Sequence, residues 1–144
     1  MDEQIKTENE KKKEYLKSYE PLVLAAKIAD RKVIDCRRDK VSISMFYDDM
    51  PHGTDKKDLS DYIVRLEKLE KDQVNARYDK ISRYVEIEQR IEMLKDEDQK
   101  NLLKIKYLEC KTWTEVCEEV GYEWAQVHRI HNKALRNFKI YDTQ

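Results

Sequence analysis

The segment TWTEVCEEVGYEWAQVHRIHNKALRNF, residues 112–138, decides the fold of the C-terminal part of the chain. Thr112 followed by Glu115 predicts a capping box, in which each side chain satisfies a backbone N–H at the start of a short helix. Gly121 predicts the end of that helix, because glycine takes the positive φ of a tight turn, and a second helix is predicted from Glu123 or Trp124. The residues that would face inward in the second helix are Val127, Ile130, Ala134, Leu135 and Phe138. Two short helices joined by a turn that contains glycine predict a helix-turn-helix.

Charge is distributed unevenly over this segment. The whole chain has a net charge of −1, which excludes a uniformly basic nucleic-acid-binding protein. Residues 112–123 carry four glutamates and no basic residue, whereas residues 124–141 carry Arg129, Lys133, Arg136 and Lys139 and no acid. A local basic surface is what contact with phosphate requires.

The second helix also carries polar side chains of the types that reach bases and phosphates. They are Gln126, His128, Arg129, Asn132, Lys133 and Arg136. Two plainer interpretations stay open: the polar side is a solvated helix face, or the helix pair is a hairpin with no role in DNA binding.

The rest of the chain is predicted to be helical as well. Charged residues make up 41% of its 144 residues, and only two Gly and two Pro are present, which favours long exposed helices over sheets. Residues 1–13 have few apolar side chains and are predicted to fray. Apolar spacing predicts a helix over 15–36, with a second helix starting at Pro21 in its first turn. A long loop is predicted near 41–56 and a long amphipathic helix over 57–94.

The apolar side of that long helix is predicted to mediate self-association. Its members are Ile63, Leu66, Val74, Tyr78, Ile81, Val85, Ile91 and Leu94. This side is too long for the preceding helix to cover, so we expect a homo-oligomer, most simply a dimer, with packing against the 96–138 bundle as the alternative. The sequence thus predicts an all-α fold in which residues 1–95 form long antiparallel, coiled-coil-like helices. Residues 96–144, whose first helix begins near Asp96 and ends near Glu109, would form the helix-turn-helix domain.

Several other classes of function are not expected. The three cysteines, Cys36, Cys110 and Cys117, form no CxxC pair, and His128 and His131 have no neighbouring ligand in sequence to complete a metal site. No catalytic motif is present, so we expect neither an enzyme nor a cofactor. No apolar run approaches the roughly 18 residues of a membrane span, and the N-terminus has no signal-peptide pattern. A cytoplasmic protein without membrane contact is therefore expected.

The C-terminal segment resembles a known family. Residues 100–138 are similar to region four of bacterial sigma factors, ending in the familiar KAL at 133–135. They resemble still more closely the ArpU/RinA-type phage and prophage regulators, through LLKIKYL at 102–108, TWTEVC at 112–117 and GYEWAQVHRIHNKAL at 121–135. The chain departs from the pattern at Glu123, where Ser or Thr is usual, and at Trp124, where a basic residue is usual.

This resemblance implies a function and assigns roles to residues. It implies a sequence-specific, double-stranded-DNA-binding transcriptional activator of phage or prophage genes, with host RNA polymerase as a candidate second partner. The residues it places at or near the major groove are Trp124, Ala125, Gln126, His128, Arg129 and Lys133. Arg129 would then contact a guanine edge and Gln126 an adenine, while Lys133 and Arg136 would touch phosphates.

Two alternatives to a DNA-binding regulator remain at this point. A small-terminase-type DNA-packaging protein also joins a helix-turn-helix to helical assembly elements, but it would form a large ring. A protein-interaction module would bind RNA polymerase in place of DNA. Oligomeric size separates the first alternative from a regulator.

Overall fold

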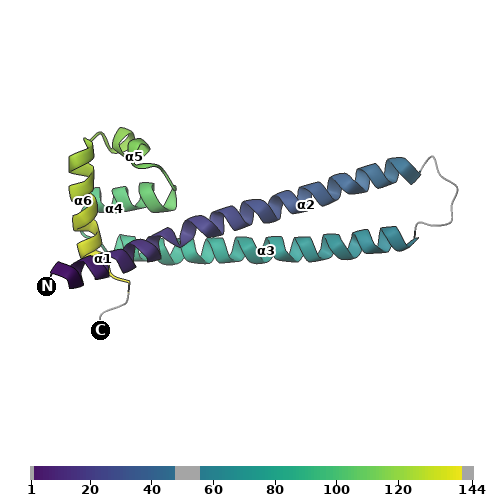
Figure 1. Ribbon diagram of the computed structural model, residues 1–144, viewed down its shortest axis with the longest axis horizontal. Coiled ribbons are helices and arrows are strands. Elements are labelled where there is room, and N and C mark those ends of the chain that lie inside the picture. The colour runs from purple at the N-terminus through teal and green to yellow at the C-terminus, as the bar shows by residue number, and fades with distance from the viewer. Residues whose placement is uncertain (1, 48–55, 141–144) are drawn as a thin grey trace. The chain divides into compact units, whose positions relative to one another are not determined.

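The computed structural model describes residues 2–47 and 56–140, and all regular secondary structure within them is helical (Figure 1). The predicted all-α fold class is confirmed. The elements are α1 (Asp2–Lys17), α2 (Tyr19–Tyr47), α3 (Lys56–Glu92), α4 (Glu97–Leu103), the π-helix η1 (Lys104–Leu108), α5 (Trp113–Val120) and α6 (Trp124–Asn137). No helix in the described part of the chain is long and apolar enough to cross a membrane.

Helix boundaries follow local sequence signals. Pro21 lies in the first turn of α2, as predicted, where its missing N–H has no partner to lose. Asp96 caps α4, and its carboxylate accepts a hydrogen bond from the Gln99 N–H at 3.2 Å. The helix predicted to end near Glu109 does so, but its last turn is a π-helix, closed by the Glu109 N–H on the Lys104 carbonyl at 3.0 Å. The π-helical turn had no signal in the sequence.

The prediction that residues 1–13 fray is wrong, because α1 is helical from Asp2. Two contacts hold its second half: Leu16 is fully buried, and the Lys12 ammonium reaches the C-terminus of α6. The charged composition that suggested fraying is typical of a helix with only one narrow buried side.

The loop predicted near 41–56 also begins too early, because α2 continues through Tyr47. The segment 41–47 contains Val, Ser, Ile and Phe, whose helix propensities lie within roughly 0.7 kcal/mol of alanine, too little to end a helix. The first strong helix-breaking residues, Pro51 and Gly53, come later in the sequence. The remainder of the predicted loop, 48–55, lies outside the described residues.

Residues 22–80 form one compact unit, a hairpin of α2 and α3 that lie side by side (Figure 1). Asp30 accepts hydrogen bonds from Gln73 and Arg77, and Arg37 pairs with Glu70, so the two helices run antiparallel. The side chains buried in this hairpin, among those described, are Ala26, Ala29, Val33, Cys36 and Tyr62. Most are small, which lets the two helices approach closely.

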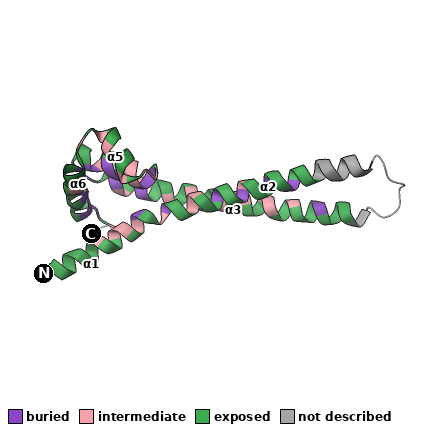
Figure 2. Ribbon diagram, turned by 45° about the horizontal axis from the view of Figure 1, so that its top comes forward, coloured by how far each residue is buried: buried purple, intermediate pink, exposed green. Residues whose placement is uncertain are grey.

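Residues 1–21 and 81–144 form the other compact unit, a helical bundle. In it α6 packs on α1, α4 and α5. Its fully buried large side chains include Phe138, Leu16, Ile87, Ile91, Leu102, Leu103, Leu135, Val116 and Val127 (Figure 2). The N-terminal segment and the end of α3 therefore contribute to the core that holds α6. Whether residues 96–144 form a domain by themselves, as the sequence division at residue 95 suggests, stays a prediction.

The apolar side predicted for the long helix has two different environments. Ile91 and Leu94 are buried in the bundle, as the packing alternative expected. Leu66 is half-buried, whereas the five remaining residues are exposed: Ile63, Val74, Tyr78, Ile81 and Val85.

Candidate nucleic-acid interface

The start of α5 is fixed by Thr112 and Glu115. The Thr112 hydroxyl accepts a hydrogen bond from the Glu115 N–H at 3.3 Å, which confirms the first half of the predicted capping box. The second half differs, because the Glu115 carboxylate accepts from the Thr112 hydroxyl at 3.2 Å and not from a backbone N–H. A hydroxyl can donate and accept at once, so the pair closes on itself.

The turn between α5 and α6 depends on Gly121. This residue takes φ 77°, as predicted, and its N–H donates to the Cys117 carbonyl at 3.0 Å. The second helix, α6, begins at Trp124, and Glu123 occupies its N-cap position without a side-chain capping bond. Glutamate is a weak N-cap residue, so the entry to α6 is set by the turn geometry more than by a cap.

Six of the eight predicted site residues share the outward side of α6. They are Ala125, Gln126, Arg129, Asn132, Lys133 and Arg136, all exposed. Their spacing of three and four places them on one helix face. The opposite face is buried at Val127, Ala134 and Leu135, and the predicted inward residue Ile130 is half-buried.

The positive charges of this outward face are not neutralised by the described chain. Within residues 2–47 and 56–140, the side chains of Arg129, Lys133 and Arg136 make no ion pair. On α5, the carboxylate of Glu115 pairs with Lys111, at 3.9 Å. The face therefore offers three cations to an anionic partner.

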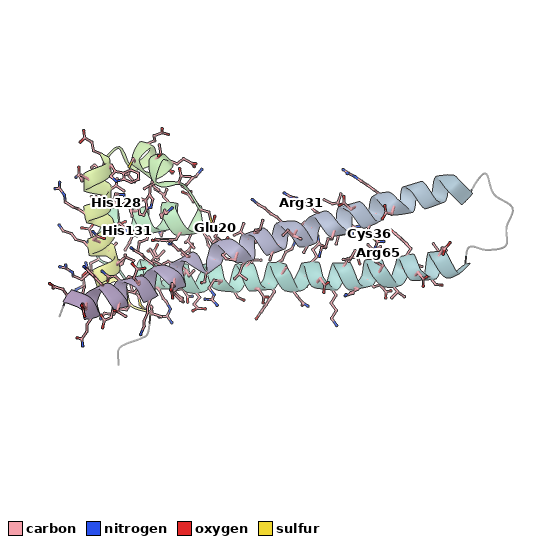
Figure 3. The ribbon with its side chains drawn as sticks, in the orientation of Figure 1. Glu20, Arg31, Cys36, Arg65, His128 and His131 are labelled. Carbon is pink, nitrogen blue, oxygen red and sulfur yellow. The ribbon has the colours of Figure 1, made fainter. Side chains whose placement is uncertain are left out.

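His128 and Trp124, the other two predicted residues, belong to a cluster of rings at the edge of that face. The His128 ring lies 4.7 Å from the Trp113 ring and 4.5 Å from the Trp124 ring, centroid to centroid (Figure 3 labels His128 on α6). His128 is half-buried, and its buried Nε2 has no hydrogen-bond partner in the described structure. Trp124 stays 54% exposed and can still meet a ligand, whereas His128 mainly supports it.

His131 attaches α6 to the bundle. The Tyr107 hydroxyl and His131 Nε2 are 2.7 Å apart and buried. Burial, with the neighbouring charge of Lys13, lowers the pKa of His131 to about 3, so the ring is neutral. Trp113 also packs here, 4.7 Å from the His131 ring and 4.9 Å from the Lys106 ammonium of η1. His131, Tyr107 and Trp113 are therefore packing residues between α6, η1 and α5. No cluster of three potential metal ligands occurs among the described side chains.

Lys12 makes a contact with the end of α6 that the sequence did not predict. Its ammonium donates to the carbonyl of Leu135 at 2.8 Å and to that of Arg136 at 3.4 Å. These carbonyls belong to the last turn of α6, where backbone acceptors are unpaired and a positive charge is favourable. The partners lie more than a hundred residues apart in sequence, so no local pattern could have revealed the pair.

The fold and this site define an all-helical protein whose last helix presents a basic, polar face held on a buried core. A family model described as "Protein of unknown function (DUF1492)" matches residues 40–139, and the chain belongs to that family. No curated protein and no solved structure matches the chain.

Proposed function

We propose that this protein is a sequence-specific, double-stranded-DNA-binding transcriptional regulator. The observation that carries the proposal is the outward face of α6, where Gln126, Arg129, Lys133 and Arg136 are exposed on one side. An α-helix about 10–12 Å across fits the roughly 12 Å width of the major groove.

The side chains of this face suit two kinds of contact. Arg129 can donate two parallel hydrogen bonds to a guanine edge, and Gln126 can pair with adenine. Lys133 and Arg136 lie further along the helix and suit phosphate oxygens, which fix the position of a protein on DNA without reading sequence.

The local geometry around α6 supports a helix-turn-helix. Gly121 turns the chain sharply between α5 and α6, and Val116 and Val127, one from each helix, are both fully buried. The similarity of residues 100–138 to region four of sigma factors points the same way. The resemblance to ArpU/RinA-type regulators further suggests activation of phage or prophage genes together with host RNA polymerase.

Selection from a random duplex library tests the DNA-binding proposal. The wild-type chain should enrich one motif. Arg129→Ala and Gln126→Ala should lose or relax that motif, since each removes a base contact. Arg31→Ala is the matched control, because Arg31 is an exposed arginine on α2 (labelled in Figure 3) and should leave the motif unchanged. Failure of the wild-type protein to enrich any motif would contradict the proposal.

The proposed role is to assist the host holoenzyme, not to replace a sigma factor. Promoter melting requires exposed aromatics that capture unstacked bases. In the N-terminal two-thirds of the chain, Tyr19 and Tyr62 are buried, and the exposed Tyr78 stands in line with Val74 and Ile81 on α3, as a packing residue does. Transcription in vitro from the selected site should therefore need host sigma factor. Transcription by core polymerase with this protein alone would contradict the accessory role.

A further inference from the structure

One side of α3 carries four large apolar side chains in contact with water. Val74 is 65% exposed, Tyr78 70%, Ile81 58% and Val85 46%. Their spacing is four, three and four residues, which places them in one line along a single helix. The same alternation characterises the seam of a coiled coil.

Within residues 2–47 and 56–140, the chain does not cover this side of α3. The contacts of α3 with α2 are made by other positions: Glu70 pairs with Arg37, and Gln73 and Arg77 bond to Asp30. Large apolar side chains are more stable buried than in water, so four left in a line on one helix mark a contact surface.

The charges at the two ends of this line indicate how a second α3 would be oriented. The next positions of the same repeat are Lys71, three residues before Val74, and Glu88, three residues after Val85. Lys71 has no ion-pair partner among the described residues. In an antiparallel pair centred between Tyr78 and Ile81, each Lys71 meets Glu88 of the other copy. A parallel pair would bring Lys71 against Lys71 and Glu88 against Glu88, which is unfavourable.

We propose that α3 binds α3 of a second copy of this chain, antiparallel, through Val74, Tyr78, Ile81 and Val85, with a Lys71–Glu88 ion pair at each end. At about 1.5 Å per residue, the seam from residue 71 to residue 88 is roughly 27 Å long. The surface contains no residue of α6, so it does not depend on the proposed DNA binding.

Sedimentation velocity on the full chain tests the pairing. Wild type should be a dimer at micromolar concentration. Ile81→Asp should raise the dimer dissociation constant about 100-fold or more, because it places a carboxylate in the apolar seam. Leu24→Asp is the matched control: Leu24 is 55% exposed but lies on α2, so this variant should remain dimeric. Circular dichroism establishes that all three chains are folded.

Two results of that experiment would overturn the proposal. One is a wild-type chain that sediments as a monomer at high micromolar concentration or as a large ring. The other is a dimer that Ile81→Asp and Leu24→Asp weaken equally.

A charge exchange tests the orientation. Lys71→Glu should weaken the dimer about tenfold, because two like-charged contacts replace two ion pairs. The double variant Lys71→Glu/Glu88→Lys should restore wild-type affinity. In a parallel pair Lys71 would lie against Lys71, so Lys71→Glu would only replace one like-charged contact with another. A dimer whose affinity Lys71→Glu leaves unchanged would therefore overturn the antiparallel register.

Discussion

The bundle (residues 1–21 and 81–144) and the hairpin (residues 22–80) are built from similar amphipathic helices but bury different kinds of side chain. The bundle encloses large ones such as Phe138, Leu103 and Leu135, whereas the hairpin encloses Ala26 and other mostly small residues. Among the described residues of the hairpin, most of the larger apolar side chains are exposed, and Figure 2 shows that exposed positions prevail along α2 and α3. Burial of apolar area is the main stabilising contribution in folding. The bundle therefore has its own core, while the hairpin has little core of its own.

The polar contacts cited for the hairpin are exposed, whereas the one cited for the bundle is buried. In the hairpin, Arg37–Glu70 and Arg65–Asp39 are exposed ion pairs, each of which contributes only about 0–1 kcal/mol. In the bundle, the Tyr107–His131 hydrogen bond is buried and has no water to replace it. The bundle therefore holds α6 on a buried core, whereas the hairpin leaves apolar side chains such as Val74 and Tyr78 exposed.

Truncating one core side chain in each region should give the largest difference. Phe138→Ala should cost about 3–5 kcal/mol of unfolding free energy, because Phe138 is fully buried and its ring lies 6.1 Å from that of Tyr15. Val33→Ala in the hairpin removes only two carbons and should cost roughly 1.6 kcal/mol. Urea unfolding measures both. Equal losses of unfolding free energy would contradict this difference between the bundle and the hairpin.

Acidification should destabilise the bundle through His131. Its pKa in the folded chain is about 3, below the usual 6.5, because burial opposes the charged ring. Above pH 6.5 the ring is neutral in both states and contributes nothing. Below that pH the unfolded chain binds the proton first, so the free energy of unfolding should fall by up to about 1.4 kcal/mol per pH unit until about pH 3.

Urea unfolding at about pH 7 and about pH 5.5 tests this pH dependence. Wild type and Val33→Ala should lose about 1 kcal/mol more than His131→Leu over that interval. Identical losses in all three chains would mean that His131 takes up a proton without unfolding. That result would contradict the assignment of His131 as a buried anchor of α6.

Gly121→Ala should lower the free energy of unfolding by less than either the core truncation at Phe138 or the acidification. A Cβ at this position would meet nothing within 4 Å, so the change is sterically free and only the positive φ of 77° opposes it. The cost should be about 1 kcal/mol, with asparagine tolerated better than alanine. Thermal unfolding measures the cost. A loss several times larger would indicate that the α5–α6 turn is strained by contacts beyond its own backbone.

Local signals in the sequence predicted the site region well. Asp96, Thr112 and Gly121 influence only the few residues next to them, so capping and turn rules located the starts of α4, α5 and α6 and the end of α5. The predicted inward residues Val127, Ala134, Leu135 and Phe138 are all buried, because their spacing follows the helical period. Helical periodicity also identified the exposed face of α6.

Capping rules and helical periodicity could not predict contacts between segments that are distant in sequence. The Lys12 contact with the end of α6 joins the two ends of the chain, and nothing near Lys12 indicates it. The helix over 41–47 was missed because the predicted loop was drawn around Pro51 and Gly53, which lie beyond the end of α2 at Tyr47. His128 was assigned to the outward face because its ring contacts with Trp113 and Trp124 depend on the packing between helices.

The most direct test of the central claim, that the outward face of α6 binds DNA, is a titration of the selected duplex at two salt concentrations. Arg129→Ala should lose about 1–3 kcal/mol of specific binding, whereas Lys133→Ala should weaken binding to all sequences and lower the salt slope by about one. Arg31→Ala should bind as wild type does. If Arg129→Ala and Lys133→Ala both bound like wild type at both salt concentrations, α6 would not be the DNA-contacting helix.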